Sequence, residues 1–141
     1  MNALSLLWLA PYRKFAPVIM RVILGVIFAL NGWNKLQGID GFAGMLDTWG
    51  VPGASLGLAY FVAVVELLGG VAMILGLFTR LSGLLLAIVM LVAIIFVHMP
   101  NGLLGDGGMA YPLALFGLAS AMALLGGGKM GLDDMMGWDT D

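Results

Sequence analysis

The sequence contains no cysteine and only one histidine, His98. Without cysteine the chain cannot form disulfides, perform thiol redox chemistry, or bind zinc or an iron–sulfur cluster through thiolates. A single histidine also excludes a bis-histidine haem built by this chain alone. Any redox chemistry in which the chain takes part must therefore rely on a bound molecule, or on a partner that holds the redox group.

Charged residues are also scarce: they make up 10% of the 141 residues, whereas hydrophobic residues make up 62%. Soluble domains carry about 25% charged and about 45–50% apolar residues. This chain has too few charges to cover a domain in water, so the composition indicates a membrane protein. We expect membrane lipids as its surroundings and no nucleic-acid partner.

Long charge-poor segments predict the membrane-spanning helices. A spanning helix needs about 17–25 mostly apolar residues. Four segments qualify, at about 16–34, 54–77, 81–98 and 110–126. The segment Ile88–Val97 is apolar on every face, as helices surrounded by lipid are. The sequence therefore predicts an all-α membrane protein, with a four-transmembrane-helix bundle over residues 16–126.

The short loops predict the orientation of this bundle. Arg13, Lys14, Arg80 and Lys129 fall on one side of the four predicted spans, and only Lys35 falls on the other. Because lysine and arginine concentrate in cytoplasmic loops, we expect both termini in the cytoplasm.

Three segments outside the spans also carry predictions. Residues 1–15 are expected to form an interfacial arm anchored by Trp8 and Tyr12. Apolar residues recur at helical spacing between Phe42 and Trp49, which predicts a short amphipathic helix on the outer membrane surface. This segment forms either a lid or an ordinary interfacial loop. Residues 127–141 form an acidic cytoplasmic tail that we expect to be exposed.

Charges and glycines recur with one spacing on the first two spans. From Arg21 to Lys35, and again from Glu66 to Arg80, charged, glycine and apolar residues lie at offsets 0, 3, 4, 7, 11 and 14. Residues with these offsets share one helical face. Glycine-rich faces let helices approach closely, so we expect them to bind a protein partner or a second copy of the chain.

Glu66 is the charged residue whose position inside a predicted span most requires an explanation. It lies about 18 Å into the second predicted span at 1.5 Å per residue, so it must be neutral, paired or beside water. Arg21 is the predicted partner, and these two residues are the catalytic candidates. If they pair, Glu66 stays ionised in a structural clamp; if Glu66 is alone, it stays protonated and suits proton exchange with a quinone.

A second polar group is predicted at the outer ends of the spans. His98 ends the third span near the level of Asn31, Asn34 and Lys35 on the first. Beneath the lid, we expect these four side chains to form a mouth for the polar head of a ligand. The alternative is that His98 is an interfacial anchor and that Lys35 extends to the membrane surface. We interpret the eleven methionines as packing residues and expect no metal site.

These motifs together resemble the DoxX family of small bacterial membrane proteins. The first-span pattern R-x2-L-G-x2-F-x3-G-x2-K runs from Arg21 to Lys35, and the second-span pattern E-x2-G-G-x2-M-x2-G-L-x-T-R runs from Glu66 to Arg80. Residues 42–52 end in a Gly-Val-Pro that is similar to the family's loop, and His98 stands where many members carry a histidine. The resemblance covers about residues 21–98.

The resemblance implies a multi-pass protein of the bacterial inner membrane, in a family named after a subunit associated with quinone-linked thiosulfate oxidation. We therefore expect a subunit of a quinone-linked oxidoreductase system that binds a quinone or a similar lipid-like ligand, with no haem or iron–sulfur cluster held by this chain alone. The alternatives are a non-catalytic membrane anchor or assembly factor, and a pathway for small solutes or protons.

Overall fold

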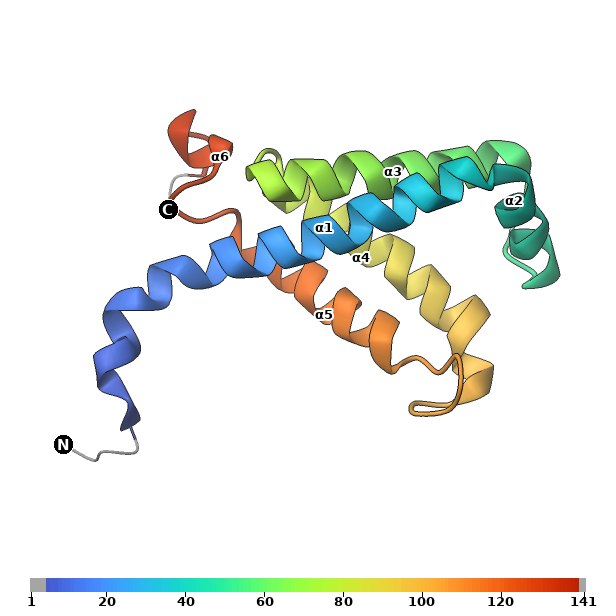
Figure 1. The fold of residues 1–141 in the computed structure, drawn as a ribbon, viewed down its shortest axis with the longest axis horizontal. Coiled ribbons are helices and arrows are strands. Elements are labelled where there is room, and N and C mark those ends of the chain that lie inside the picture. The colour runs from blue at the N-terminus through green and yellow to red at the C-terminus, as the bar shows by residue number, and fades with distance from the viewer. Residues whose placement is uncertain (1–4, 140–141) are drawn as a thin grey trace.

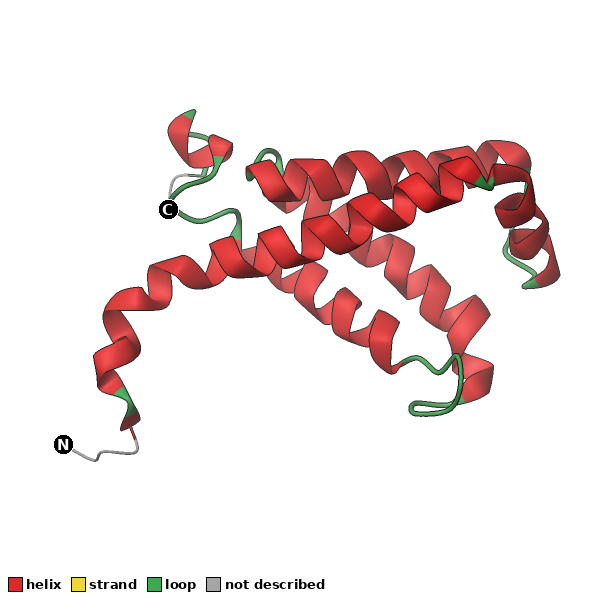
Figure 2. Cartoon of the chain, viewed as in Figure 1, coloured by secondary structure: helices red, strands yellow, loops and turns green. Residues whose placement is uncertain are grey.

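The structure is a computed structural model that describes residues 5–139. Within that range it consists of helices joined by loops, as Figure 2 shows, and contains no strand. Residues 1–4 of the predicted arm and residues 140–141 of the predicted tail lie outside the described residues. The all-helical prediction is confirmed.

The helices begin and end close to the predicted positions. The long ones are α1 (Ala16–Gln37), α3 (Leu56–Leu75), α4 (Thr79–Ala93) and α5 (Ala110–Leu125). The chain continues from α4 into a π-helical turn, η3 (Ile94–His98), and a 3-10 turn, η4 (Met99–Asn101). Shorter elements are the 3-10 helix η2 (Leu7–Phe15), α2 (Ile39–Thr48) and α6 (Leu132–Met135). The helix α2 confirms the short amphipathic helix that was predicted between Phe42 and Trp49.

Three helical stretches are long and apolar enough to cross a membrane: Leu7–Gln37, Leu56–Leu75 and Thr79–Asn101. The apolar helix α5 is shorter, at 16 residues. At 1.5 Å per residue it measures about 24 Å, against about 30 Å for the hydrocarbon core of a bilayer. The chain is thus an integral membrane protein, with three helices of spanning length among residues 5–139.

Local signals in the sequence fix the ends of α3. The side chain of Ser55 accepts a hydrogen bond from the backbone N–H of Leu58 at 3.1 Å, which caps the first turn. At the other end Gly76 adopts a left-handed conformation with φ of 66°, which glycine tolerates better than other residues. The chain then turns at once into α4.

Glycines bring α1 and α3 into close antiparallel contact (Figure 1). A Cβ atom added to Gly25 would lie 2.5 Å from the carbonyl oxygen of Gly70, and one on Gly32 would lie 2.6 Å from that of Ala63. Gly83 plays the same part between α4 and α5, where an added Cβ would lie 2.8 Å from the oxygen of Ala119. The molecule is therefore built from two glycine-mediated helix pairs.

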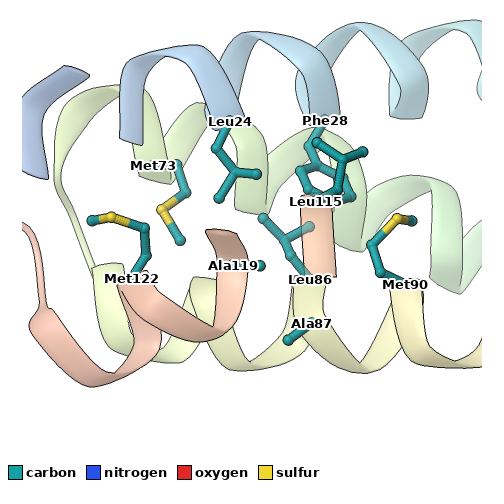
Figure 3. Packing of buried hydrophobic residues seen from close by; sticks show 9 residues of the cluster. All are labelled: Leu24, Phe28, Met73, Leu86, Ala87, Met90, Leu115, Ala119 and Met122. Atoms are coloured by element: carbon teal, nitrogen blue, oxygen red, sulfur yellow. The ribbon is translucent and has the colours of Figure 1, made fainter. Parts of the chain in front are cut away.

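The two pairs meet in an apolar core. Figure 3 shows its nine buried side chains, which come from α1, α3, α4 and α5: Leu24, Phe28, Met73, Leu86, Ala87, Met90, Leu115, Ala119 and Met122. Leu24, Phe28, Met73 and Leu86 are completely buried. This core holds the pairs together in the middle of the molecule.

The bundle has two unlike ends, seen at the left and right of Figure 1. We call the end formed by Arg21, residues 76–80 and residues 126–139 the termini end, because α1 begins there and the C-terminal segment lies there. The opposite end, formed by residues 35–51 and 98–109, is called the α2 end. The pair α4–α5 diverges from the pair α1–α3 toward the α2 end.

Candidate functional site

A large cavity lies where the two helix pairs diverge. Its volume is about 580 Å³, and residues from α1, α2, α3, α4, η3 and α5 line it. Small-molecule sites in proteins range over about 300–1,000 Å³, so this cavity has the size of a binding site. Most of its lining is apolar: Leu58, Val62, Ile88, Val89, Val92, Ala93, Phe96 and Leu115 are among the lining residues.

A charged pair forms the polar part of the lining. The Nζ atom of Lys35 donates a hydrogen bond to Oε2 of Glu66, and the two form a salt bridge. Lys35 lies in the last turn of α1, and Glu66 lies in the middle of α3. Nζ also lies 5.0 Å from the ring centroid of Phe42 on α2, in cation–π contact. Three helices thus meet at this lysine.

Only one of the two carboxylate oxygens of Glu66 accepts a hydrogen bond from the described residues. Glu66 is completely buried. Lys35 holds its Oε2, whereas its Oε1 has no hydrogen-bond partner among the described residues. A buried acceptor without a donor is costly, about 1–3 kcal/mol. The site therefore keeps an acceptor that a ligand can satisfy.

The other predicted head-group residues divide into two groups. Asn31 and His98 line the cavity together with Lys35 and Glu66. The Nδ1–H of His98 donates to the carbonyl oxygen of Gly107 at 2.7 Å, so the loop after η4 fixes the ring. Asn34 is exposed and does not line the cavity.

The α2 helix closes one side of the cavity. Phe42 and Leu46 are buried, and both line the cavity together with Trp49. These are residues of the stripe that predicted a lid. In the structure α2 packs against α3, so the cavity is roofed at the α2 end.

The cavity reaches the surface of the molecule beside residues of α3, α4 and α5. Phe61 on α3, Ile88 on α4 and Tyr111 on α5 line it, although 61%, 49% and 59% of their surfaces are exposed. Residues that line a cavity and are also exposed mark its opening. Because Phe61 and Ile88 are apolar and lie on helices of spanning length, we expect this part of the opening to face lipid.

Arg21 takes no part in this cavity, and the predicted pair of Arg21 with Glu66 is wrong. Arg21 is 4% exposed, and its Nη2 donates to the carbonyl oxygen of Met130 at 2.8 Å in the C-terminal segment. Its guanidinium packs against Gly76, which directly follows α3 and lies ten residues beyond Glu66. Ten residues of helix separate the two levels by about 15 Å, which an arginine side chain cannot span.

The expectation of an exposed tail is also wrong for Asp133. This residue is buried, and both of its carboxylate oxygens accept backbone hydrogen bonds at the start of α4. Oδ1 accepts from Phe78 at 2.7 Å, and Oδ2 accepts from Thr79 at 2.8 Å. The C-terminal segment thereby caps α4 and covers the termini end.

The spacing shared by α1 and α3 could have identified Lys35 as the partner of Glu66. In an antiparallel pair the last residue of one motif lies beside the first residue of the other, so Lys35 faces Glu66 and Arg21 faces the end that holds Arg80. The sequence prediction paired Glu66 with Arg21 from their estimated depths in the membrane. It did not align the two motifs in antiparallel order, which would have placed Lys35 beside Glu66. No local signal marks apolar lining residues such as Val62 and Phe96.

Known proteins provide an independent view of this arrangement. A family profile for DoxX matches residues 16–99, which include α1, α2, α3, α4, η3 and Lys35, Glu66 and His98. The chain belongs to the DoxX family. The predicted resemblance is therefore confirmed.

Two relatives in particular are similar to this DoxX chain. One is "Putative oxidoreductase CatD" of Bacillus subtilis (strain 168), which is 35% identical over 120 residues, covering 85% of this chain and 86% of the relative. The other is "Inner membrane protein YqjF" of Escherichia coli (strain K12), which is 33% identical over 70 residues, covering 50% of this chain and 52% of the relative.

A third relative, an uncharacterized protein of Haemophilus influenzae (strain ATCC 51907 / DSM 11121 / KW20 / Rd), is 30% identical over 106 residues, covering 75% of this chain and 73% of the relative. No solved structure matches the chain significantly.

Proposed function

We propose that this DoxX protein is the ligand-binding membrane subunit of a quinone-linked oxidoreductase system, and that it holds a quinone or a similar lipid-like molecule in its cavity. The observation that carries the proposal is the apolar cavity with the Lys35–Glu66 ion pair in its lining, in which Glu66 is buried and Lys35 is partly exposed. The name of the Bacillus subtilis relative, an oxidoreductase, is consistent with such a role.

The lining fits the two parts of such a ligand. The polar head lies at Lys35 and Glu66, which supply a donor and an acceptor, and Asn31 and His98 stand at the same cavity. The apolar tail leaves between Phe61 and Ile88 into the bilayer. A bound quinone would supply the electron chemistry, because a chain without cysteine performs no thiol redox chemistry and holds no thiolate-ligated redox centre. The protein binds and orients the head and excludes water from it.

We also propose that the chain spans the bacterial inner membrane four times, with both termini in the cytoplasm. The helix α5 then forms the fourth span, and its 16 residues require little tilt or a locally thinner bilayer. Arg13, Lys14, Arg80 and Lys129 lie toward the termini end, whereas Lys35 lies toward the α2 end. The name of the Escherichia coli relative supports the inner membrane.

A cavity-filling variant tests the binding function without touching the charged pair. Val62→Trp places a large ring in the cavity, whereas Val71→Trp places the same ring on the exposed face of the same helix. Binding of a decyl-substituted benzoquinone to the protein in lipid nanodiscs is measured by partition against empty nanodiscs. We expect Val62→Trp to weaken binding at least tenfold and Val71→Trp to leave it unchanged. Equal binding by the two variants would refute the cavity as the site.

A membrane anchor or assembly factor is the second candidate function. Gly25, Gly32 and Gly70 pack within the chain, so these glycines of the predicted partner face are occupied by its own helices. Gly117 on α5 has open space beside it, which leaves room for a helix of a partner or a second copy. If this function holds, the wild-type protein does not bind quinone. The variant Gly117→Leu then no longer co-purifies with the partner or the second copy.

A further inference from the structure

The charged pair makes the cavity electrically neutral. Of the residues that line it, Lys35, Glu66, His98 and Tyr111 can titrate. Lys35 and Glu66 form an ion pair, so the two side chains together carry no net charge. A phosphate or carboxylate head would therefore enter an apolar cavity without a free counter-charge, which is costly. The lining favours an uncharged head group.

The unpaired oxygen of Glu66 requires a hydrogen-bond donor on the uncharged head group of the ligand. Oε1 is buried, belongs to a completely buried residue that lines the cavity, and has no donor among residues 5–139. A carbonyl group on a ligand offers only another acceptor, which Oε1 cannot use. A hydroxyl group offers the missing donor, and a hydrogen bond to a carboxylate is stronger than one between neutral groups.

We propose that the cavity selects an uncharged amphiphile whose head group donates a hydroxyl hydrogen bond to Oε1 of Glu66. This inference rests on the proposed function, because it names which form of the ligand the same site prefers. For a quinone-type ligand the reduced, dihydroxy form binds more tightly than the oxidised, dicarbonyl form. Lys35 keeps its bond to Oε2, so the hydroxyl completes the carboxylate without breaking the pair.

The size of the preference follows from one charge-assisted hydrogen bond. Such a bond gives a preference on the order of tenfold. For a two-electron couple a tenfold preference for the reduced form raises the midpoint potential of the bound ligand by about 30 mV. The protein would thus make its bound quinone easier to reduce than the same molecule in the surrounding lipid.

Three ligands with the same ring and tail test the proposal on the wild-type protein. They are a decyl-substituted benzoquinone, its hydroquinone, and the dimethyl ether of that hydroquinone, which lacks both hydroxyl donors. Binding is measured anaerobically by partition between nanodiscs with and without protein. We expect the hydroquinone to bind about tenfold more tightly than the other two. Equal binding of all three leaves the proposed function standing and overturns the hydroxyl preference; binding of none overturns both.

Glu66→Gln then assigns the preference to the residue. A glutamine whose oxygen faces Lys35 presents its NH₂ group, a donor, where Oε1 stood. The hydroquinone preference should disappear or reverse in this variant, whereas Asp134→Asn, which changes an exposed carboxylate at the termini end, should keep it. A full hydroquinone preference in Glu66→Gln would overturn the proposal. If Glu66→Gln does not fold, the comparison of hydroquinone with its dimethyl ether on the wild type decides.

Discussion

Each end of the bundle contains a cation from α1 and a buried carboxylate from another element, but the two carboxylates are used differently. At the termini end, Asp133 accepts backbone hydrogen bonds through both oxygens, from Phe78 and Thr79. At the α2 end, Glu66 accepts through one oxygen, from Lys35, and its other oxygen lacks a donor. A fully used carboxylate is typical of a structural cap, and a half-used one beside a cavity is typical of a binding site.

The packing around the two carboxylates also differs: it is tight around Asp133 and open around Glu66. Around Asp133 and Arg21 the C-terminal segment folds back, and Gly76 and Gly131 pack directly against the guanidinium of Arg21. Around Glu66 the helix pairs diverge and leave a cavity of about 580 Å³. This comparison supports the proposal that the α2 end holds the ligand, whereas the termini end stabilises the fold.

The largest expected effect comes from breaking the contact that both ends share. Gly70→Leu would push a side chain into the backbone of α1, where an added Cβ already lies 2.6 Å from the oxygen of Gly25. Overpacking of this kind costs about 3 kcal/mol or more, so we expect little folded protein and no ligand binding. Gly117→Leu, at a glycine with open space, is the matched control. Equal thermal stability of the two variants would contradict the glycine-mediated contact.

A smaller effect is expected from the cap at the termini end. Asp133→Ala removes two hydrogen bonds to the backbone of α4. Loss of a helix cap costs about 0.5–2 kcal/mol, and we expect about 2 kcal/mol here because two buried donors lose their partner. Thermal unfolding in nanodiscs measures the loss. Hydroquinone affinity should stay within twofold of the wild type, and a tenfold loss of affinity would mean that the two ends are not separate.

The smallest expected effect on stability comes from an exposed aromatic residue in the same C-terminal segment. Trp138 packs on Phe78 with ring centroids 5.3 Å apart. An aromatic pair of this kind contributes about 0.5–1.5 kcal/mol, and because Trp138 is exposed we expect Trp138→Ala to cost about 0.5 kcal/mol. The thermal midpoint should fall slightly and ligand binding should not change. A cost as large as that of Asp133→Ala would show that the ring, rather than the cap, holds the segment.

The sequence predicted features that depend on local pattern. The apolar segments, the helix α2 and the family motifs were all recognised from spacing and composition, because helix periodicity and turn residues act over a few positions. The partner of Glu66 was not, because it depends on how α1 and α3 align, and the glycine contacts set that alignment. The role of Asp133 was not recognised either, since an acidic tail looks solvated until tertiary contacts bring it to α4.

Binding of the decyl-substituted hydroquinone to the double variant Lys35→Met/Glu66→Leu tests most directly whether the charged pair serves the ligand. Replacing both members of a buried ion pair by apolar residues is often neutral or stabilising. We therefore expect the double variant to unfold at a temperature equal to or above that of the wild type, yet to bind the hydroquinone at least tenfold more weakly. A folded double variant that binds the hydroquinone as tightly as the wild type would contradict the assignment of Lys35 and Glu66 to the binding site.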